Sequence, residues 1–279
     1  MKVFYKVSEL QSYLAKFKQN NSLGFVPTMG ALHAGHISLI KRAKQENELN
    51  VTSIFVNPTQ FDKEEDLIKY PKTLNSDLEK LQGYCDLVFV PSVEEIYPEV
   101  VSSKQFNFNG LDKTMEGAFR KGHFDGVGTV VKRLFEIVEP TKAYFGEKDF
   151  QQLTIIKKMV ELEGLSVEII DCPIEREKDG LAMSSRNQRL TADQRAEAPI
   201  IFKTLQMARA MFPDKEISAI RKMVEDTFKN NPVLKLEYFE IADIETLQPT
   251  DQKIDNKTYR AFIAVFADTV RLIDNIALN

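Results

Sequence analysis

The chain has 279 residues and a formal net charge of −4, with 43% hydrophobic and 28% charged residues. This composition is ordinary for a folded globular protein, and its acidic balance disfavours nucleic acid as the main partner. No run approaches the ~18 apolar residues that a membrane span requires, and the N-terminus lacks the apolar core of a signal peptide. With only Cys85 and Cys172, both expected to be buried, we expect a cytoplasmic protein without membrane contact.

Short apolar runs alternate with amphipathic segments through the first two thirds of the chain. We expect strands at residues 23–26, 51–56, 87–90, 143–145 and 167–170, and helices at 37–47, 76–81, 126–138 and, capped by Asp149, up to about 162. Strands that alternate with helices imply right-handed crossovers and an α/β fold with a parallel sheet. Ligands of such sheets bind beyond the carboxyl ends of the strands.

The pattern changes in the last third of the chain. Thr191 or Asp193 begins a long helical stretch that Pro199 interrupts. A second helix and three strands are then expected, at residues 217–228, 236–241, 259–265 and 270–273. Helices followed by clustered strands indicate a smaller α+β unit. We place the boundary in a polar, turn-like segment, which gives domains of residues 1–178 and 179–279.

The most informative stretch, PTMGALHAGH, lies between the first expected strand and the helix that follows it. A helix N-terminus attracts phosphate, and Gly30 and Gly35 let a ligand approach the backbone closely. His33 and His36 are three residues apart, so both imidazoles can face one bound group and donate hydrogen bonds to it. A chance pair or a metal site is the alternative, but no cysteine or third histidine stands at ligand spacing.

A second polar segment, MSSRN, supplies hydroxyl groups from Ser184 and Ser185 and a guanidinium from Arg186, which binds phosphate in fork geometry. An exposed serine-rich loop is the ordinary interpretation, and the pairing with the histidine motif favours an oxyanion clamp. The two motifs together resemble the HIGH and KMSKS signatures of the class I adenylate-forming nucleotidyltransferase superfamily. The resemblance implies attack of an anion on the α-phosphate of ATP, with pyrophosphate leaving.

Two further segments start where expected strands end. In GEKDFQQL, Lys148 is a point charge suited to phosphate, and Gln152 offers a donor and an acceptor to a hydroxy acid. In FVNPTQF, Asn57 and Gln60 are uncharged polar groups in an apolar setting, which suits a small polar substrate. An exposed helix start and a simple Asn-Pro turn are the respective structural alternatives.

A fifth segment, RKGHFDGV, places Arg120 and His123 as candidates to lie beside an anionic ligand. A surface loop with a helix N-cap at Asp125 fits the same spacing equally well.

In chain order, PTMGALHAGH, FVNPTQF, RKGHFDGVGTVV, YFGEKDFQQL and MSSRN are similar to the motif series of the pantothenate synthetases, over residues 24–190. The resemblance implies a Rossmann-like nucleotide-binding domain, a smaller C-terminal lid domain and a homodimer. It also implies that pantoate and ATP, with Mg²⁺, form pantoyl adenylate and pyrophosphate, and that β-alanine then displaces AMP to give pantothenate. No enzyme nucleophile is required, which fits the absence of a nucleophile–base motif.

The resemblance also assigns residue roles by motif position. The expected ATP site comprises Met29, Gly30, Ala31, Leu32, His33, Ala34, Gly35, His36, Gly146, Glu147, Lys148, Asp149, Glu175, Met183, Ser184, Ser185 and Arg186. His36 corresponds to the usual proton donor, with His33 beside it and Lys148 reaching phosphate as the third catalytic residue. The expected substrate-binding residues are Asn57, Gln60, Arg120, His123 and Gln152.

The sequence departs from the family pattern at residues 70–77. Family members often carry several consecutive acidic residues there that help to hold magnesium, whereas this chain has only Asp77. Mg²⁺ prefers phosphate oxygens and water, so no protein ligand is assigned to it.

Two other functions compete with the ligase. A nucleotidyltransferase that moves AMP or CMP onto a phosphorylated substrate would share the histidine motif and the MSSRN loop. The uncharged Asn57 and Gln60 favour a hydroxy-acid pocket over a second phosphate site. An RNA-binding module is disfavoured by the acidic charge and by the absence of a stripe of interleaved basic and aromatic residues.

Overall fold

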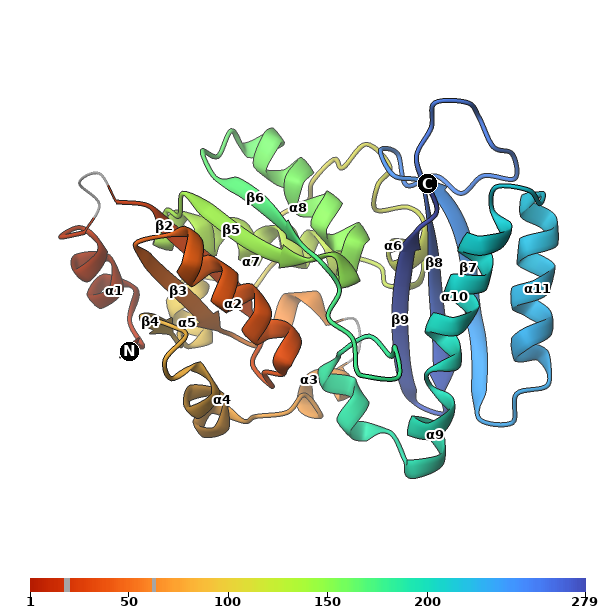
Figure 1. Cartoon of the computed structure of the whole chain (residues 1–279). Coiled ribbons are helices and arrows are strands. Elements are labelled where there is room, and N and C mark those ends of the chain that lie inside the picture. The colour runs from red at the N-terminus through yellow and green to blue at the C-terminus, as the bar shows by residue number, and fades with distance from the viewer. Residues whose placement is uncertain (18–20, 62–63) are drawn as a thin grey trace.

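A six-stranded sheet forms the centre of the N-terminal part of the chain in the computed structural model, which describes residues 1–17, 21–61 and 64–279 (Figure 1). All its strands are parallel, in the order β1-β4-β3-β2-β5-β6. The strands are β1 (Lys2–Phe4), β2 (Leu23–Thr28), β3 (Leu49–Ile54), β4 (Leu87–Phe89), β5 (Lys142–Gly146) and β6 (Glu168–Cys172). The chain runs outward from β2 through β3 to β4 and later returns to place β5 on the other side of β2. The topological switch point, where such folds bind ligands, therefore lies between β2 and β5.

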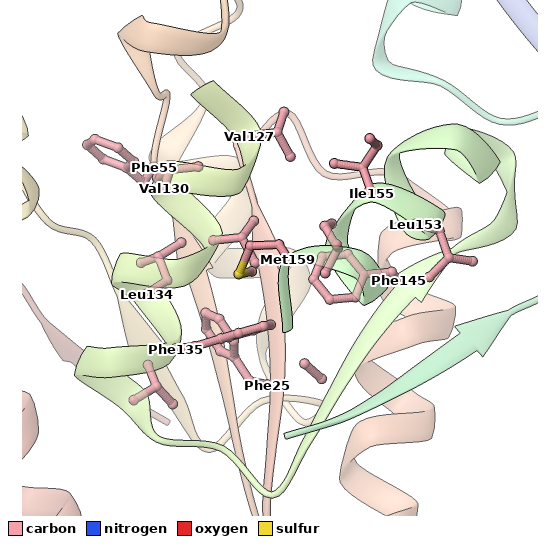
Figure 2. Close-up of a cluster of buried hydrophobic side chains, with 14 of the residues drawn as sticks. Phe25, Phe55, Val127, Val130, Leu134, Phe135, Phe145, Leu153, Ile155 and Met159 are labelled. Carbon is pink, nitrogen blue, oxygen red and sulfur yellow. The ribbon is translucent and has the colours of Figure 1, made fainter. Parts of the chain in front are cut away.

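Helices cover both faces of this sheet (Figure 1). One face carries α2 (Ala34–Glu46) and α4 (Leu74–Leu81), and the other carries α1 (Val7–Leu14), α7 (His123–Val138) and α8 (Phe150–Glu163). Successive strand residues point to opposite faces. Phe25 thus packs in the cluster beneath α7 and α8, which Figure 2 shows, whereas Val26 packs beneath α2. Burial on both faces explains why these strands read as continuous apolar runs.

Short helical turns follow several strands and carry polar residues to the edge of the sheet. They are η1 (Pro58–Gln60) after β3, η2 (Glu147–Asp149) after β5 and η3 (Ser185–Arg189) after β6, with α3 (Glu64–Ile68), α5 (Val93–Ile96) and α6 (Met115–Phe119) in the longer connections.

The C-terminal unit is a three-stranded antiparallel sheet with helices on its outer face (Figure 1). It comprises α9 (Ala192–Glu197), α10 (Ile200–Met211), α11 (Ile217–Lys229), β7 (Leu234–Asp243), β8 (Tyr259–Ala267) and β9 (Val270–Ala277). Ile263 faces the cluster formed with α10 and α11, whereas its neighbour Phe262 packs in the core of the N-terminal unit. The inner face of this small sheet is therefore joined to the N-terminal unit.

The expected parallel α/β sheet and the smaller α+β unit are confirmed. The division at residues 178 and 179 stays a prediction, and Leu181 already packs in the C-terminal cluster. Thr191, rather than Asp193, caps α9, because its hydroxyl accepts the N–H of Gln194 and the Gln194 amide accepts that of Thr191. Within the described residues, no helix combines the length and apolarity needed to cross a bilayer.

The alternative of a helix N-cap at Asp125 is wrong, whereas the expected N-cap at Asp149 is confirmed in position. Helix α7 begins at His123 after Gly122, whose φ of 76° a glycine adopts readily, so Asp125 lies inside the first turn. The Asp125 carboxylate instead accepts the N–H of Phe106. Asp149 does occupy the N-cap position of α8, but its side chain makes no capping hydrogen bond. The Asp149 carboxylate instead lies 3.8 Å from the Lys148 ammonium.

Candidate functional site

The histidine motif and the GEKD segment meet at the switch point of the sheet. The first follows β2 and the second follows β5, and these strands are hydrogen-bonded neighbours. Both loops therefore leave the sheet at the same edge, and Lys148 is close enough to lower the pKa of His33 and of His36. Residues far apart in sequence thus form one site because the topology places their strands side by side.

His33 and His36 hold each other in place through a capping box at the start of α2. The Nδ1 atom of His33 accepts the N–H of Gly35 at 3.2 Å, and the Nδ1 atom of His36 accepts the N–H of His33 at 3.3 Å. Because each Nδ1 accepts, the remaining ring proton of each neutral imidazole lies on Nε2. The ring centroids are 4.0 Å apart, so the two Nε2–H donors serve one region of space.

Burial keeps both imidazoles uncharged. The pKa of His36 falls to about 3, first through burial and then through electrostatic interactions with His33, Lys148 and Lys80. The pKa of His33 falls to about 4, again chiefly through burial, with Lys148 as the next cause. At neutral pH the motif therefore offers two neutral N–H donors, and the positive charge that draws an anion comes from the lysines.

Asp77 holds the turn that precedes these histidines. Its carboxylate is 1% exposed and accepts the N–H groups of Ala31 and Leu32, at 2.9 and 2.8 Å, as well as the Thr73 hydroxyl at 2.9 Å. Gly30 and Ala31 have φ values of 81° and 50°, in the left-handed region that costs an alanine about 1 kcal/mol or more. The hydrogen bonds to the carboxylate compensate for that strain. Sequence reasoning missed this role because the bonded N–H groups lie 45 and 46 residues before Asp77 in the chain.

These contacts also bear on metal binding. The oxygens of Asp77 are engaged by N–H and O–H donors, which a cation would have to displace. In the described part of the chain, no group of three or more His, Cys, Asp or Glu residues is arranged to hold a metal ion.

A cavity of about 200 Å³ lies beside His36, between β2, η1 and α7. Its apolar wall comes from Val127, Val130 and Leu134, which are also part of the packed core shown in Figure 2. Its polar lining includes His36, Gln60, Asp149 and Gln152, together with Asn57 and Tyr70. An apolar wall with a few polar groups is typical of a site for a small molecule with both apolar and polar parts.

Asn57 lines this cavity but uses its polar atoms within the protein. Its oxygen accepts the hydroxyls of Tyr97 and Thr59, at 2.7 and 3.1 Å. Its nitrogen donates to the carbonyl of Gly126 and to the side-chain oxygen of Gln60, both at 3.2 Å. Asn57 therefore orients Gln60, whose amide nitrogen remains directed toward the sulfur of Met29.

A smaller cavity, of about 30 Å³, lies between the two units and contains the other expected anion-binding residues. It is lined by Arg120, His123 and Lys148, and it shares Asp149 and Gln152 with the larger cavity. The Nε2 atom of His123 accepts from Arg120 at 3.0 Å, so Nδ1 carries the proton and donates to the Gln60 carbonyl at 2.8 Å. Burial and the Arg120 charge lower the pKa of His123 to about 4, which makes this histidine a neutral bridge between Arg120 and η1.

The MSSRN loop approaches the larger cavity through Tyr70. Ser184 caps η3 by accepting the N–H of Arg186 at 3.2 Å, while Ser185 and Arg186 line a narrow pocket with Tyr70. Burial raises the pKa of Tyr70, with a hydrogen bond to Ser185 opposing it. Glu175 lies next to Gly35 at the start of α2, and its carbonyl accepts the Met183 N–H. The structure thus brings all five sequence segments around one edge of the sheet.

Comparisons with known proteins show what the whole chain is similar to. The model of the family described as pantoate-beta-alanine ligase matches residues 2–277. The chain is 52% identical to the pantothenate synthetase of Flavobacterium psychrophilum and 53% identical to that of Christiangramia forsetii, over the full length of each protein. The crystal structure of pantothenate synthetase from Thermus thermophilus has a TM-score of 0.92 and 40% identity, covering all of this chain and 99% of that one. A pantoate-beta-alanine ligase from Francisella tularensis, complexed with beta-gamma ATP and beta-alanine, has a TM-score of 0.81 and 35% identity, covering all of this chain and 98% of that one.

Proposed function

Because the chain belongs to the pantoate-β-alanine ligase family, we propose that it joins pantoate to β-alanine through a pantoyl-adenylate intermediate, consuming ATP and releasing AMP and pyrophosphate. The observation that carries this proposal is that a group of phosphate-binding side chains and a cavity for a small molecule lie next to each other at the switch point of the sheet. Paired neutral histidines and Lys148 suit a triphosphate, and the adjacent cavity suits a small hydroxy acid.

In the first step, a carboxylate oxygen of pantoate forms a bond to the α-phosphorus of ATP, and the bond from that phosphorus to the bridging oxygen breaks. The leaving pyrophosphate gains negative charge, which the Nε2–H donors of His33 and His36, Lys148 and the Arg186 guanidinium stabilise. Because the histidines are neutral, they act here as hydrogen-bond donors rather than as cations.

In the second step, the amine of β-alanine attacks the acyl carbon, the bond to the AMP oxygen breaks, and a proton leaves the new amide nitrogen. Gln60 and Gln152 hold the pantoyl group in the larger cavity, whose apolar wall accepts the branched carbon skeleton. Arg120 and His123 line the smaller cavity, and we assign them to the binding of an anionic substrate group. The remaining residues of the turns at 29–36, 146–149 and 183–186, with the backbone at Glu175, surround the nucleotide.

Mg²⁺ would be held by the phosphates of ATP and would neutralise part of their negative charge. Its preference for phosphate oxygens and water supports this assignment. The engagement of Asp77 with backbone N–H groups does so as well. Family resemblance alone supports three further parts of the proposal, namely a homodimer, a cytoplasmic location and a lid function for residues 179–279.

The test is an omission assay with ATP, Mg²⁺, pantoate and β-alanine, each left out in turn. We expect AMP, pyrophosphate and pantothenate in equal amounts, and pantoate-dependent exchange of labelled pyrophosphate into ATP without β-alanine. Formation of ADP would contradict an adenylate intermediate. A product unaffected by β-alanine would favour a nucleotidyltransferase instead.

A further inference from the structure

The last strand of the C-terminal unit contacts the turn that carries Lys148. Asn275 on β9 is 2% exposed, and its side-chain nitrogen donates to the carbonyl oxygens of Glu147 and of Lys148, both at 2.9 Å. A primary amide has two N–H groups, so both are used on this one turn. The small cavity is lined by Asn275 and by Lys148 alike.

The Asn275 amide is itself held in one orientation. Its oxygen accepts from Arg260, whose guanidinium also donates to the Glu147 carboxylate at 3.0 Å and lies 4.1 Å from the Phe150 ring centre. Its backbone N–H donates to the Asp274 carboxylate, which is paired with Arg176 at 2.6 Å. Rotation of the amide would break contacts on both sides, so the direction of its donors is fixed.

The orientation of the Glu147 and Lys148 carbonyl groups determines the direction in which the Lys148 side chain leaves the backbone. Turning the Glu147 and Lys148 carbonyls toward β9 fixes the peptide planes on both sides of the Lys148 α-carbon. A lysine is a point charge on a flexible chain, so its effective placement depends on the backbone that carries it. The Lys148 ammonium lies 3.8 Å from the Asp149 carboxylate, a distance too long for that pair to hold it alone.

We propose that Asn275 is a positioning residue for Lys148. By holding the turn at residues 147–148 from the C-terminal unit, it keeps the ammonium at the phosphate-binding edge of the sheet. The inference rests on the proposed function, because it takes Lys148 as a ligand of the ATP phosphates. Correct docking of the C-terminal sheet thereby becomes a condition for tight nucleotide binding.

The test compares Asn275→Ala, Lys148→Ala and the double variant, by calorimetric titration with Mg²⁺ and a non-hydrolysable ATP analogue. We expect Asn275→Ala to weaken binding by roughly tenfold, which corresponds to the loss of one hydrogen bond between the Lys148 ammonium and a phosphate of the analogue. If Asn275 acts through Lys148, the same change in the Lys148→Ala background has less than about a twofold effect, because contacting residues are not additive. Asn275→Asp keeps an oxygen for Arg260 but cannot donate to the carbonyls, so we expect it to bind as weakly as Asn275→Ala.

Asn50→Ala is the matched control. Asn50 is fully buried, donates to the carbonyls of Ile40 and Tyr84 and accepts the N–H of Asp86, away from the nucleotide loops. It should lower the thermal midpoint as Asn275→Ala does, but leave the affinity for the analogue unchanged. Equal loss of affinity in both variants, or full additivity with Lys148→Ala, overturns the inference. A wild-type chain that binds the analogue but makes no pantothenate contradicts the proposed function alone.

Discussion

Replacing Asp77 tests whether this carboxylate holds the histidine turn or binds metal. Asp77→Ala leaves the N–H groups of Ala31 and Leu32 without an acceptor in a buried setting. Hydrogen bonds to a charged group contribute ~1.5–3 kcal/mol each, and two bonds to one carboxylate are not additive. We therefore expect the free energy of unfolding to fall by about 3–4 kcal/mol. Asp77→Asn retains one acceptor oxygen and should lose about half as much.

The assay is urea unfolding of each variant, followed by pantothenate formation over a range of Mg²⁺ concentrations. Asp251→Asn serves as the control, because that carboxylate is 80% exposed in its pair with Arg221 and should change stability by less than about 0.5 kcal/mol. We expect kcat to fall with stability in the Asp77 series, while the Mg²⁺ concentration for half-maximal rate stays constant. An Asp77→Asn variant with normal stability and a strongly raised Mg²⁺ requirement would refute the positioning role and identify a metal ligand.

Three further results are expected. His36→Ala should slow pyrophosphate exchange by roughly 10²-fold, whereas His36→Gln, which keeps a neutral N–H donor, should retain more activity. Equal loss of activity in both variants would contradict the account in which a neutral N–H donor suffices at this position. The lowered pKa values of His33, His36 and His123 mean that the unfolded state binds protons first on acidification. The free energy of unfolding should therefore be at its full value above pH 6.5 and should fall toward pH 4, by up to ~1.4 kcal/mol per pH unit for each histidine. A free energy from urea unfolding that stays constant between pH 6.5 and pH 4 would contradict the lowered pKa values. Arg271→Met leaves the Glu116 carboxylate buried without its bidentate partner and should lower the free energy of unfolding by about 3–5 kcal/mol. The check is a double variant with Glu116→Leu, in which we expect the stability to recover. A loss below about 1 kcal/mol in Arg271→Met would show that the pair is not buried in solution.

Sequence reasoning worked best where periodicity and topology act together. Apolar runs on both sides of residues 29–36 identify a strand and a helix, and the parallel alternation predicts a ligand site beyond the carboxyl ends of the strands. Helix α1 (Val7–Leu14) was missed, and so was the short edge strand β1, because three residues give no periodic signal. Helices α5 and α6, of four and five residues, were missed for the same reason.

The site residues that sequence reasoning missed act through bonds to distant backbone groups. Asp77 bonds to N–H groups 45 and 46 positions away, and Asn275 bonds to carbonyls 127 and 128 positions away. Neither contact leaves a local pattern, because the partner is a peptide group that any residue supplies. Asn57 was expected to bind substrate, and that role stays a prediction: Asn57 lines the larger cavity, and its amide nitrogen is bonded to Gln60 and to the Gly126 carbonyl. The spacing of residues in a motif indicates chemistry but not which member touches the ligand.

The transfer of oxygen from pantoate to AMP is the most direct measure of the central claim that a carboxylate attacks the α-phosphorus of ATP beside His33 and His36. Pantoate labelled with ¹⁸O in its carboxylate should yield AMP that carries one labelled oxygen on phosphorus for each pantothenate formed. Label found in inorganic phosphate, together with ADP, would place the attack on the γ-phosphorus and contradict the account.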